Sequence, residues 1–260
     1  MNRWILLFFV SLIGLLCSSC EKLDNKCCEC LEENGESDAY DYPIMPGSEE
    51  WKKLSSHTAM VEVCQIPRKT LKDMCTFGLI ETYYNYPLIF VVGAFNNTKE
   101  GMQQMFEEFN GANELLNRND APSKLMAKYD QLNPADLDTT WTLLEQGNFQ
   151  FQFTWMELTL AYDPILKALT KAQKSELVHI AVTTYNERMK ISPSNWKTLT
   201  STFLIANLLY ELQYQPFMTF INNHPSMNSL IDGYMNNLYS LSEVEREELV
   251  NIINKFLIDF

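Results

Sequence analysis

The stretch LSEVEREELVNIINKFLIDF (residues 241–260) shows the helical period of this sequence most clearly. Its apolar side chains recur at spacings of three, four and seven, and acidic residues fill the first turns. Ser242 and Glu245 stand at the spacing of a capping box, which marks a helix start. The stretch therefore predicts an amphipathic helix.

The same period recurs upstream. Residues 173–191 predict a second long helix, with Thr170 and Gln173 at capping-box spacing. Ser192-Pro193 predicts the start of another, because proline suits the first helical position. Eight prolines divide residues 51–260 into short segments, as expected for many helices. We predict an all-α fold, a multi-helix array of the helical-bundle or α-α superhelix type.

Two stretches are ambiguous by pattern alone. Residues 88–95 (LIFVVGAF) form an apolar run too short for its period to separate a buried strand from a core helix. Residues 149–155 alternate aromatic and polar side chains as a strand does, but helical spacing continues through Leu158, Ala161 and Tyr162. We interpret most of residues 151–170 as helix.

The composition, with 46% hydrophobic and 20% charged residues in a chain of 260, is that of a folded protein. A net charge of −13 has the wrong sign for neutralising phosphates, so we expect no nucleic-acid partner. Residues 21–50 contain ten acidic and two basic residues, which concentrates a net −8 near the amino terminus.

The amino terminus reads as an export signal. Arg3 precedes the apolar residues 4–16, and small residues follow. Thirteen helical residues span about 20 Å, less than the ~30 Å hydrocarbon core of a bilayer. Leu16-Cys17-Ser18-Ser19-Cys20 resembles a bacterial lipobox, which implies removal of residues 1–19 and lipidation of Cys20. A plain secretory signal cleaved elsewhere, or an uncleaved anchor, is the alternative.

Residues 20–47 are acidic, contain Gly35, Gly47, Pro43 and Pro46 and have few core-forming side chains, so we predict a flexible tether. The helical domain is then residues 48–260, with a candidate sub-boundary near 191. The acidic stretch after Cys20 resembles the surface-export signal of Bacteroidota lipoproteins. This implies an outer-membrane location and leaves the periplasmic or surface face open.

Processing would leave five cysteines, an odd number, so at least one stays unpaired within the chain. Cys27, Cys28 and Cys30 could hold zinc or copper(I), but they lack the paired C-x₂-C spacing of structural zinc sites. We therefore expect no metal and no other cofactor, and keep these three as weak candidates. Cys64 and Cys75 lie among apolar residues and are predicted to be buried, inert thiols.

No nucleophile elbow, metalloprotease helix motif, phosphate-binding loop or dinucleotide fingerprint occurs in the sequence. Glu176 and His179 have the Glu-x-x-His spacing of di-iron bundles, which need that motif twice. His57 and His224 are interpreted as loop or cap residues. No catalytic residue is predicted.

Aromatic residues cluster twice, at positions 83–90 and 149–155. Core packing accounts for most of them. The candidates for a ligand or glycan platform are Tyr83, Tyr84, Tyr86 and Trp155.

Several short motifs carry a family resemblance: Pro46-Gly47-Ser48-Glu49-Glu50-Trp51, Cys64-Gln65-Ile66-Pro67, Tyr84-Asn85-Tyr86-Pro87, Phe109-Asn110-Gly111 and Phe151-Gln152-Phe153-Thr154-Trp155. They resemble a family of exported helical proteins of unknown function from Bacteroidales, over about residues 43–190. The resemblance implies an envelope setting and an all-α domain, and it brings no catalytic residues.

The expected function is non-catalytic binding or assembly at the cell envelope, with a membrane contact through the lipid and an envelope protein or glycan as partner. One alternative is an envelope lipoprotein hydrolase whose carboxylates converge only in the fold. Another is a metal-binding accessory protein that uses Cys27, Cys28 and Cys30.

Replacement of the lipidated residue tests the anchor. We expect Cys20→Ala to abolish labelling by a fatty-acid probe and to release the protein from membranes, because two acyl chains suffice for stable anchoring. Fractionation and probe labelling of cells measure both effects. Labelling that persists in the variant would contradict the assignment.

Overall fold

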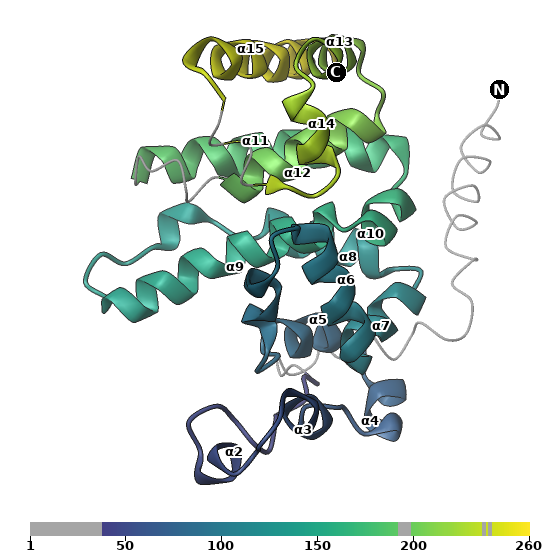
Figure 1. Ribbon diagram of the computed structural model, residues 1–260, viewed down its shortest axis with the longest axis vertical. Coiled ribbons are helices and arrows are strands. Elements are labelled where there is room, and N and C mark those ends of the chain that lie inside the picture. The colour runs from purple at the N-terminus through teal and green to yellow at the C-terminus, as the bar shows by residue number, and fades with distance from the viewer. Residues whose placement is uncertain (1–37, 192–198, 236–237, 239–240) are drawn as a thin grey trace, which may run out of the picture. The chain divides into compact units, whose positions relative to one another are not determined.

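The computed structural model describes residues 38–191, 199–235, 238 and 241–260, and every regular element within them is helical (Figure 1). The elements are, in chain order, α2 (Glu49–Lys52), α3 (His57–Val63), α4 (Arg68–Asp73), α5 (Thr76–Tyr84), η1 (Ile89–Ala94), α6 (Thr98–Glu108), α7 (Asn110–Asn117), α8 (Ala121–Asp130), η2 (Pro134–Asp136), α9 (Leu143–Ala161), α10 (Asp163–Ala168), α11 (Lys171–Ile191), α12 (Leu199–Glu211), α13 (Gln215–Asn223), α14 (Ser226–Ile231) and α15 (Glu243–Asp259). The predicted all-α, multi-helix fold is confirmed. None of the described helices is both long and apolar enough to cross a bilayer.

Some predictions lie outside the described residues. They concern the signal, Cys20, the first part of the tether, the cluster of Cys27, Cys28 and Cys30, and the helix start at Ser192-Pro193.

The long helices α9, α11 and α12 form the centre of the fold. Helix α12 packs against both α9 and α11 (Figure 1). Ten of its eleven side chains from Leu199 to Leu209 are buried, and Thr202 is the exception. A helix buried on nearly all sides must be covered by several neighbours, and α13 and α14 supply the rest of the cover.

The packed unit begins at Ala39, upstream of the predicted start at residue 48, and extends to Phe260 without a division near 191. The backbone N–H of Tyr40 donates to Thr82 Oγ1 at 2.8 Å, and the Tyr42 hydroxyl donates to the Thr82 carbonyl at 3.0 Å. Tyr42 is 8% exposed. These two tyrosines attach an otherwise acidic, proline-containing stretch to α5.

The structure resolves both ambiguous stretches as helical. Residues 89–94 form the 3₁₀ helix η1, in which Ile89 and Val92 are buried. Three residues per turn place these two side chains on one face. Residues 143–161 form α9. The helical spacing therefore predicted this stretch correctly, and the local alternation of aromatic and polar side chains does not indicate a strand.

Predicted capping boxes are confirmed at two helix starts. Ser242 and Glu245 exchange backbone and side-chain hydrogen bonds at the start of α15. Thr170 and Gln173 do the same before α11. A third box, between Thr142 and Glu145, starts α9 and was not anticipated.

Three of the five motifs quoted for the family resemblance, at residues 64–67, 84–87 and 109–111, meet in one joint of the fold. The Asn110 side chain accepts from the Ile66 N–H at 3.0 Å and donates to the Ile66 carbonyl at 2.8 Å. The side chain of Gln65 accepts from the Asn110 N–H and donates to the Glu108 carbonyl. Phe109 stacks on Tyr86, with ring centroids 4.1 Å apart. These residues therefore hold α3 and α4 against the junction of α6 and α7.

Two helical glycines give a matched test of this joint. A Cβ at Gly111 would overlap the Phe109 ring and lie 2.8 Å from Ile66 Cδ1, whereas a Cβ at Gly147 meets nothing within 4 Å. We expect Gly111→Ala to lower the free energy of unfolding by about 1–3 kcal/mol through overpacking. Gly147→Ala should raise it by about 0.5–1 kcal/mol through helix propensity. Urea denaturation measures both, and equal effects of one sign would contradict the packing of this joint.

Candidate functional site

A hollow of about 540 Å³ lies between the end of α5, the following turn, η1, the end of α8 and the middle of α9. We call it the aromatic groove. It is lined by Met45, Pro46, Glu81, Tyr84, Asn85, Tyr86, Pro87, Ile89, Phe90, Lys128, Leu132, Asn148, Phe151, Gln152 and Met156. Its volume falls in the range of small-molecule sites.

Four aromatic rings line the groove. Phe90 on η1 is 66% exposed, and its ring centroid lies 4.5 Å from that of Phe151 on α9. Tyr84 is half-buried and its hydroxyl donates to Met156 Sδ, while Tyr86 is almost completely buried. Phe90 is therefore the most exposed of the four rings.

Five polar side chains also line the groove: Glu81, Asn85, Lys128, Asn148 and Gln152. None of the five makes a side-chain hydrogen bond or ion pair with any residue that the structure describes. All five are exposed or half-buried, so water satisfies them in the free protein. They are available to bind a ligand without first breaking contacts within the protein.

Burial raises the pKa of Tyr84 and of Tyr86 well above 10. A charged phenolate would lose its hydration in these positions, so the neutral form is favoured. Nearby groups act in the same direction: Tyr83 and Glu157 on Tyr84, and Cys64 and Glu108 on Tyr86. Both phenols keep their proton over the whole physiological pH range.

The predicted platform of Tyr83, Tyr84, Tyr86 and Trp155 requires a correction. Tyr84 and Tyr86 line the groove, but Tyr83 and Trp155 are 0% and 1% exposed and lie in the core. Adjacent positions on a helix face different directions, and α9 covers the face of α5 that carries Tyr83. Trp155 instead stacks behind Phe151, with centroids 6.1 Å apart, and so supports the groove from within.

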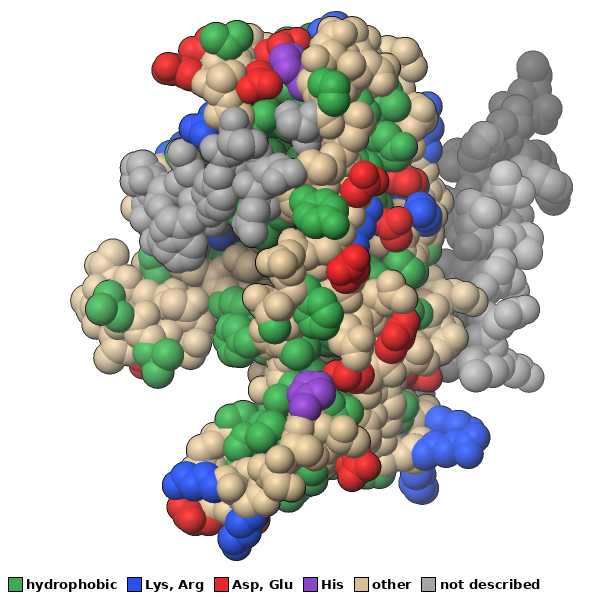
Figure 2. Space-filling model, viewed as in Figure 1, with side chains coloured by type: hydrophobic (Ala, Val, Ile, Leu, Met, Phe, Trp, Pro, Cys, Tyr) green, Lys and Arg blue, Asp and Glu red, His purple; other side chains and the backbone are tan. Residues whose placement is uncertain are grey.

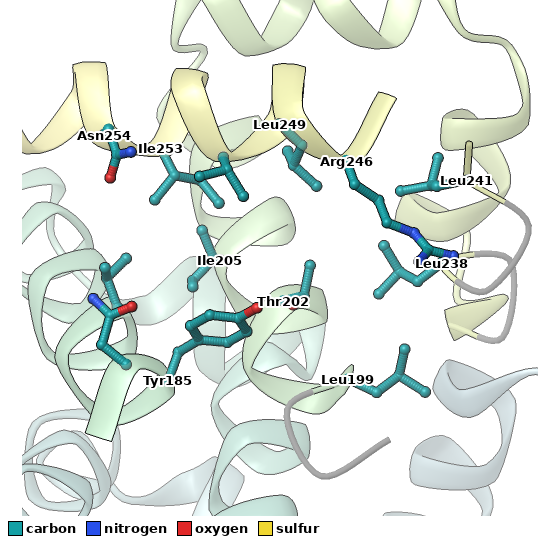
Figure 3. Close-up of a pocket in the computed structure, with 13 residues that line it drawn as sticks. Tyr185, Leu199, Thr202, Ile205, Leu238, Leu241, Arg246, Leu249, Ile253 and Asn254 are labelled. Carbon is teal, nitrogen blue, oxygen red and sulfur yellow. The ribbon is translucent and has the colours of Figure 1, made fainter. Parts of the chain in front are cut away.

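Two further hollows lie in the carboxy-terminal half. One of about 170 Å³ opens between α11, α12 and α15, where Tyr185, Ile205, Leu249 and Ile253 give it mostly apolar walls (Figure 3). The other, of about 740 Å³, lies between the start of α11, the turn before α13 and the end of α15, and Tyr214 and Phe256 are among its lining residues. Both contain fewer polar side chains without partners than the aromatic groove does, so they are weaker candidates for a polar ligand.

A fully buried ion pair joins the central helices α9 and α11. It was not predicted from the sequence. Arg188 Nη1 on α11 donates to both carboxylate oxygens of Glu157 on α9, at 3.0 and 3.1 Å. The hydroxyls of Tyr129, Thr200 and Ser201 also donate to this carboxylate. We call these five residues the buried polar network. One available signal was a glutamate inside the apolar run of residues 155–161.

The buried polar network has the residue types of a catalytic site, but a substrate has no path to it from the surface hollows. Glu157 and Arg188 are 0% and 2% exposed, and neither lines any of the three hollows. Arg188 Nε and Nη2 find no hydrogen-bond partner among the described residues, and the Phe153 ring lies 5.1 Å from Arg188 Cζ. We assign the network a structural role.

Two of the three histidines bond to carboxylates of neighbouring helices. His57 bonds to Glu108 across α3 and α6, and His224, the C-cap residue of α13, lies between Glu245 and Glu248 of α15. Within the described ranges no group of three or more His, Cys, Asp or Glu residues could hold a metal ion. Cys64 and Cys75 are buried, as predicted, and neither forms a disulfide. Burial raises the pKa of the Cys64 thiol to about 11, which suppresses the reactive thiolate.

Comparison of the chain with protein-family models, curated proteins and solved structures finds no match.

The structural role of the ion pair is tested by a double-mutant cycle. We expect Glu157→Leu and Arg188→Met to lower the free energy of unfolding by about 3–5 kcal/mol each, because each leaves one buried charge unpaired. The double variant should lose much less than the sum, since both charges are then gone. Urea denaturation measures all four proteins, and additive losses would show that the two residues act independently.

Proposed function

We propose that this protein is a lipid-anchored envelope protein that binds a neutral glycan in the aromatic groove without catalysis. One observation carries the proposal: Phe90, Phe151 and their neighbouring tyrosines lie beside five polar side chains that have no side-chain partner among the described residues. Aromatic rings beside a few available polar groups are the usual lining of a small-molecule site.

The chemistry of the groove suits a sugar. The C–H face of a pyranose ring packs on the electron-rich face of an aromatic ring. Sugar hydroxyls both donate and accept hydrogen bonds, and so do the side-chain amides of Asn85, Asn148 and Gln152. Glu81 and Lys128 carry opposite charges, so the groove has no net charge to select an ionic ligand.

Binding is favoured over hydrolysis by the distribution of carboxylates. A glycosidase places two carboxyl groups across the scissile bond, roughly 5–10 Å apart. Among the described residues, Glu81 is the carboxylate that lines the aromatic groove, and Asp259 lines the 740 Å³ hollow. A second carboxylate facing either one is not among the lining residues.

The envelope location in this proposal comes from the sequence. The signal in residues 1–19, the lipobox ending at Cys20 and the acidic stretch that follows all support export to the outer membrane. The resemblance to exported helical proteins from Bacteroidales supports the same setting.

The experiment uses immobilised neutral oligosaccharides of glucose, galactose, mannose and N-acetylglucosamine. We expect the protein to bind at least one of them, and Phe90→Ala to weaken that binding about 3- to 10-fold, as expected for an aromatic contact of about 0.5–1.5 kcal/mol. Phe95→Ala is the matched control, because Phe95 is also partly exposed but does not line the groove. Unchanged binding by Phe90→Ala, or equal loss in both variants, would contradict the proposal.

A further inference from the structure

The start of α9, together with the residue before its N-cap, exposes three large apolar side chains within four residues. Leu143 is 88% exposed, Leu144 74% and Trp141 37%. We call these three residues the α9 tip. Figure 1 shows the start of α9 projecting beyond the neighbouring helices, and Figure 2 shows hydrophobic side chains on the surface of this projecting part. Contiguous exposed apolar surface of this kind marks a contact with a membrane or a protein.

The α9 tip is held in place by its own contacts. The capping box of Thr142 and Glu145 fixes the helix start, and the Gln146 side chain donates to the Trp141 carbonyl at 2.9 Å. The Trp141 ring lies edge-on to Phe149, with centroids 5.7 Å apart. The apolar side chains are thus presented on an ordered turn, which lowers the entropy cost of a contact.

The segment of chain that carries the α9 tip contains acidic residues and no basic ones. The sequence has no Lys or Arg between Lys128 and Lys167. Hydrogen bonds from Thr140 lower the pKa of Asp138, and those from Thr142 lower the pKa of Glu145. Both carboxylates are therefore ionised at neutral pH, so an anionic surface would repel the tip. A neutral, zwitterionic lipid surface would not.

The chain outside the described structure brings lipid close to the tip. The residues from Cys20 to Asp38 can span at most about 65 Å. A folded unit of residues 39–260 is roughly 45 Å across. A lipid on Cys20 therefore leaves every face of the domain within reach of the bilayer, at high effective concentration.

We propose that the α9 tip inserts Trp141, Leu143 and Leu144 into the interfacial region of a neutral phospholipid bilayer. The contact forms a second attachment point beside the lipid on Cys20, and in this respect it rests on the proposed anchor. Tryptophan suits this position because its ring is apolar and its N–H remains near water. The leucines supply the apolar area that enters the acyl boundary.

The test replaces the biological anchor by a defined one. The chain from residue 21 onward, with an amino-terminal hexahistidine tag, is attached to vesicles of phosphatidylcholine and phosphatidylethanolamine that contain a nickel-chelating lipid. Brominated phosphatidylcholine then reports tryptophan insertion by quenching. We expect quenching in the native protein and its loss in Trp141→Phe, which assigns the signal to the tip.

Affinity is measured with the untagged chain and vesicles without the chelator. The double variant Leu143→Gln, Leu144→Gln should partition about tenfold more weakly, because the apolar contact is removed while charge and helix propensity are kept. Val244→Gln is the matched control, since Val244 is 72% exposed on α15 away from the tip, and it should bind as the native chain does.

The charge of the vesicle lipids distinguishes a neutral bilayer from a protein as the partner of the α9 tip. Quenching in neutral vesicles that falls when phosphatidylglycerol is added supports the proposal. Quenching only in vesicles with a cationic lipid overturns it and indicates a protein partner with a basic rim. Quenching that persists in Trp141→Phe also overturns it. Neither assay depends on acylation of Cys20 or on a glycan, so failure here is separate from failure of the proposed function.

Discussion

The pairing of Glu157 with Arg188 is the constraint on which the rest of the structure depends. Two opposite charges without access to water must be matched in distance and orientation, or the desolvation cost is not offset. Their partners come from α8, α9, α11 and α12, so these four helices can pack in few relative positions. We infer that the hydrophobic contacts around the network supply most of the stability, whereas the network favours one packing of the helices over others.

Helix α9 connects the buried polar network to the surface of the protein. Its second half carries Glu157 in the core, its middle presents Phe151 to the aromatic groove, and its first turn carries the exposed Leu143 and Leu144. Ring contacts connect these regions, from Trp141 through Phe149 to Phe153, whose ring lies beneath Arg188. A single rigid element therefore orients both proposed contact surfaces.

Features with a local physical cause could be predicted from the sequence. Capping boxes at Ser242 and Thr170, the helical period of residues 151–170 and the burial of Cys64 depend on near neighbours in the chain. The ion pair could not be found in this way, because its members are 31 positions apart and no spacing rule connects them. Tyr83 and Tyr84 show the same limit: they are adjacent, but the packing of α9 on α5 sends one to the core and the other to the groove.

The two buried thiols have a consequence for oxidation. Cys64 is 0% exposed and Cys75 is 4% exposed, and neither forms a disulfide, so neither can take part in thiol–disulfide exchange unless the domain opens. Under the proposed export and lipidation of Cys20, this leaves Cys27, Cys28 and Cys30 as the cysteines that can be oxidised. Three thiols cannot all pair within one chain. Oxidation would therefore leave one sulfur for a second molecule, and two copies held on the same membrane could become covalently linked through their amino-terminal segments while their folded domains stay unchanged.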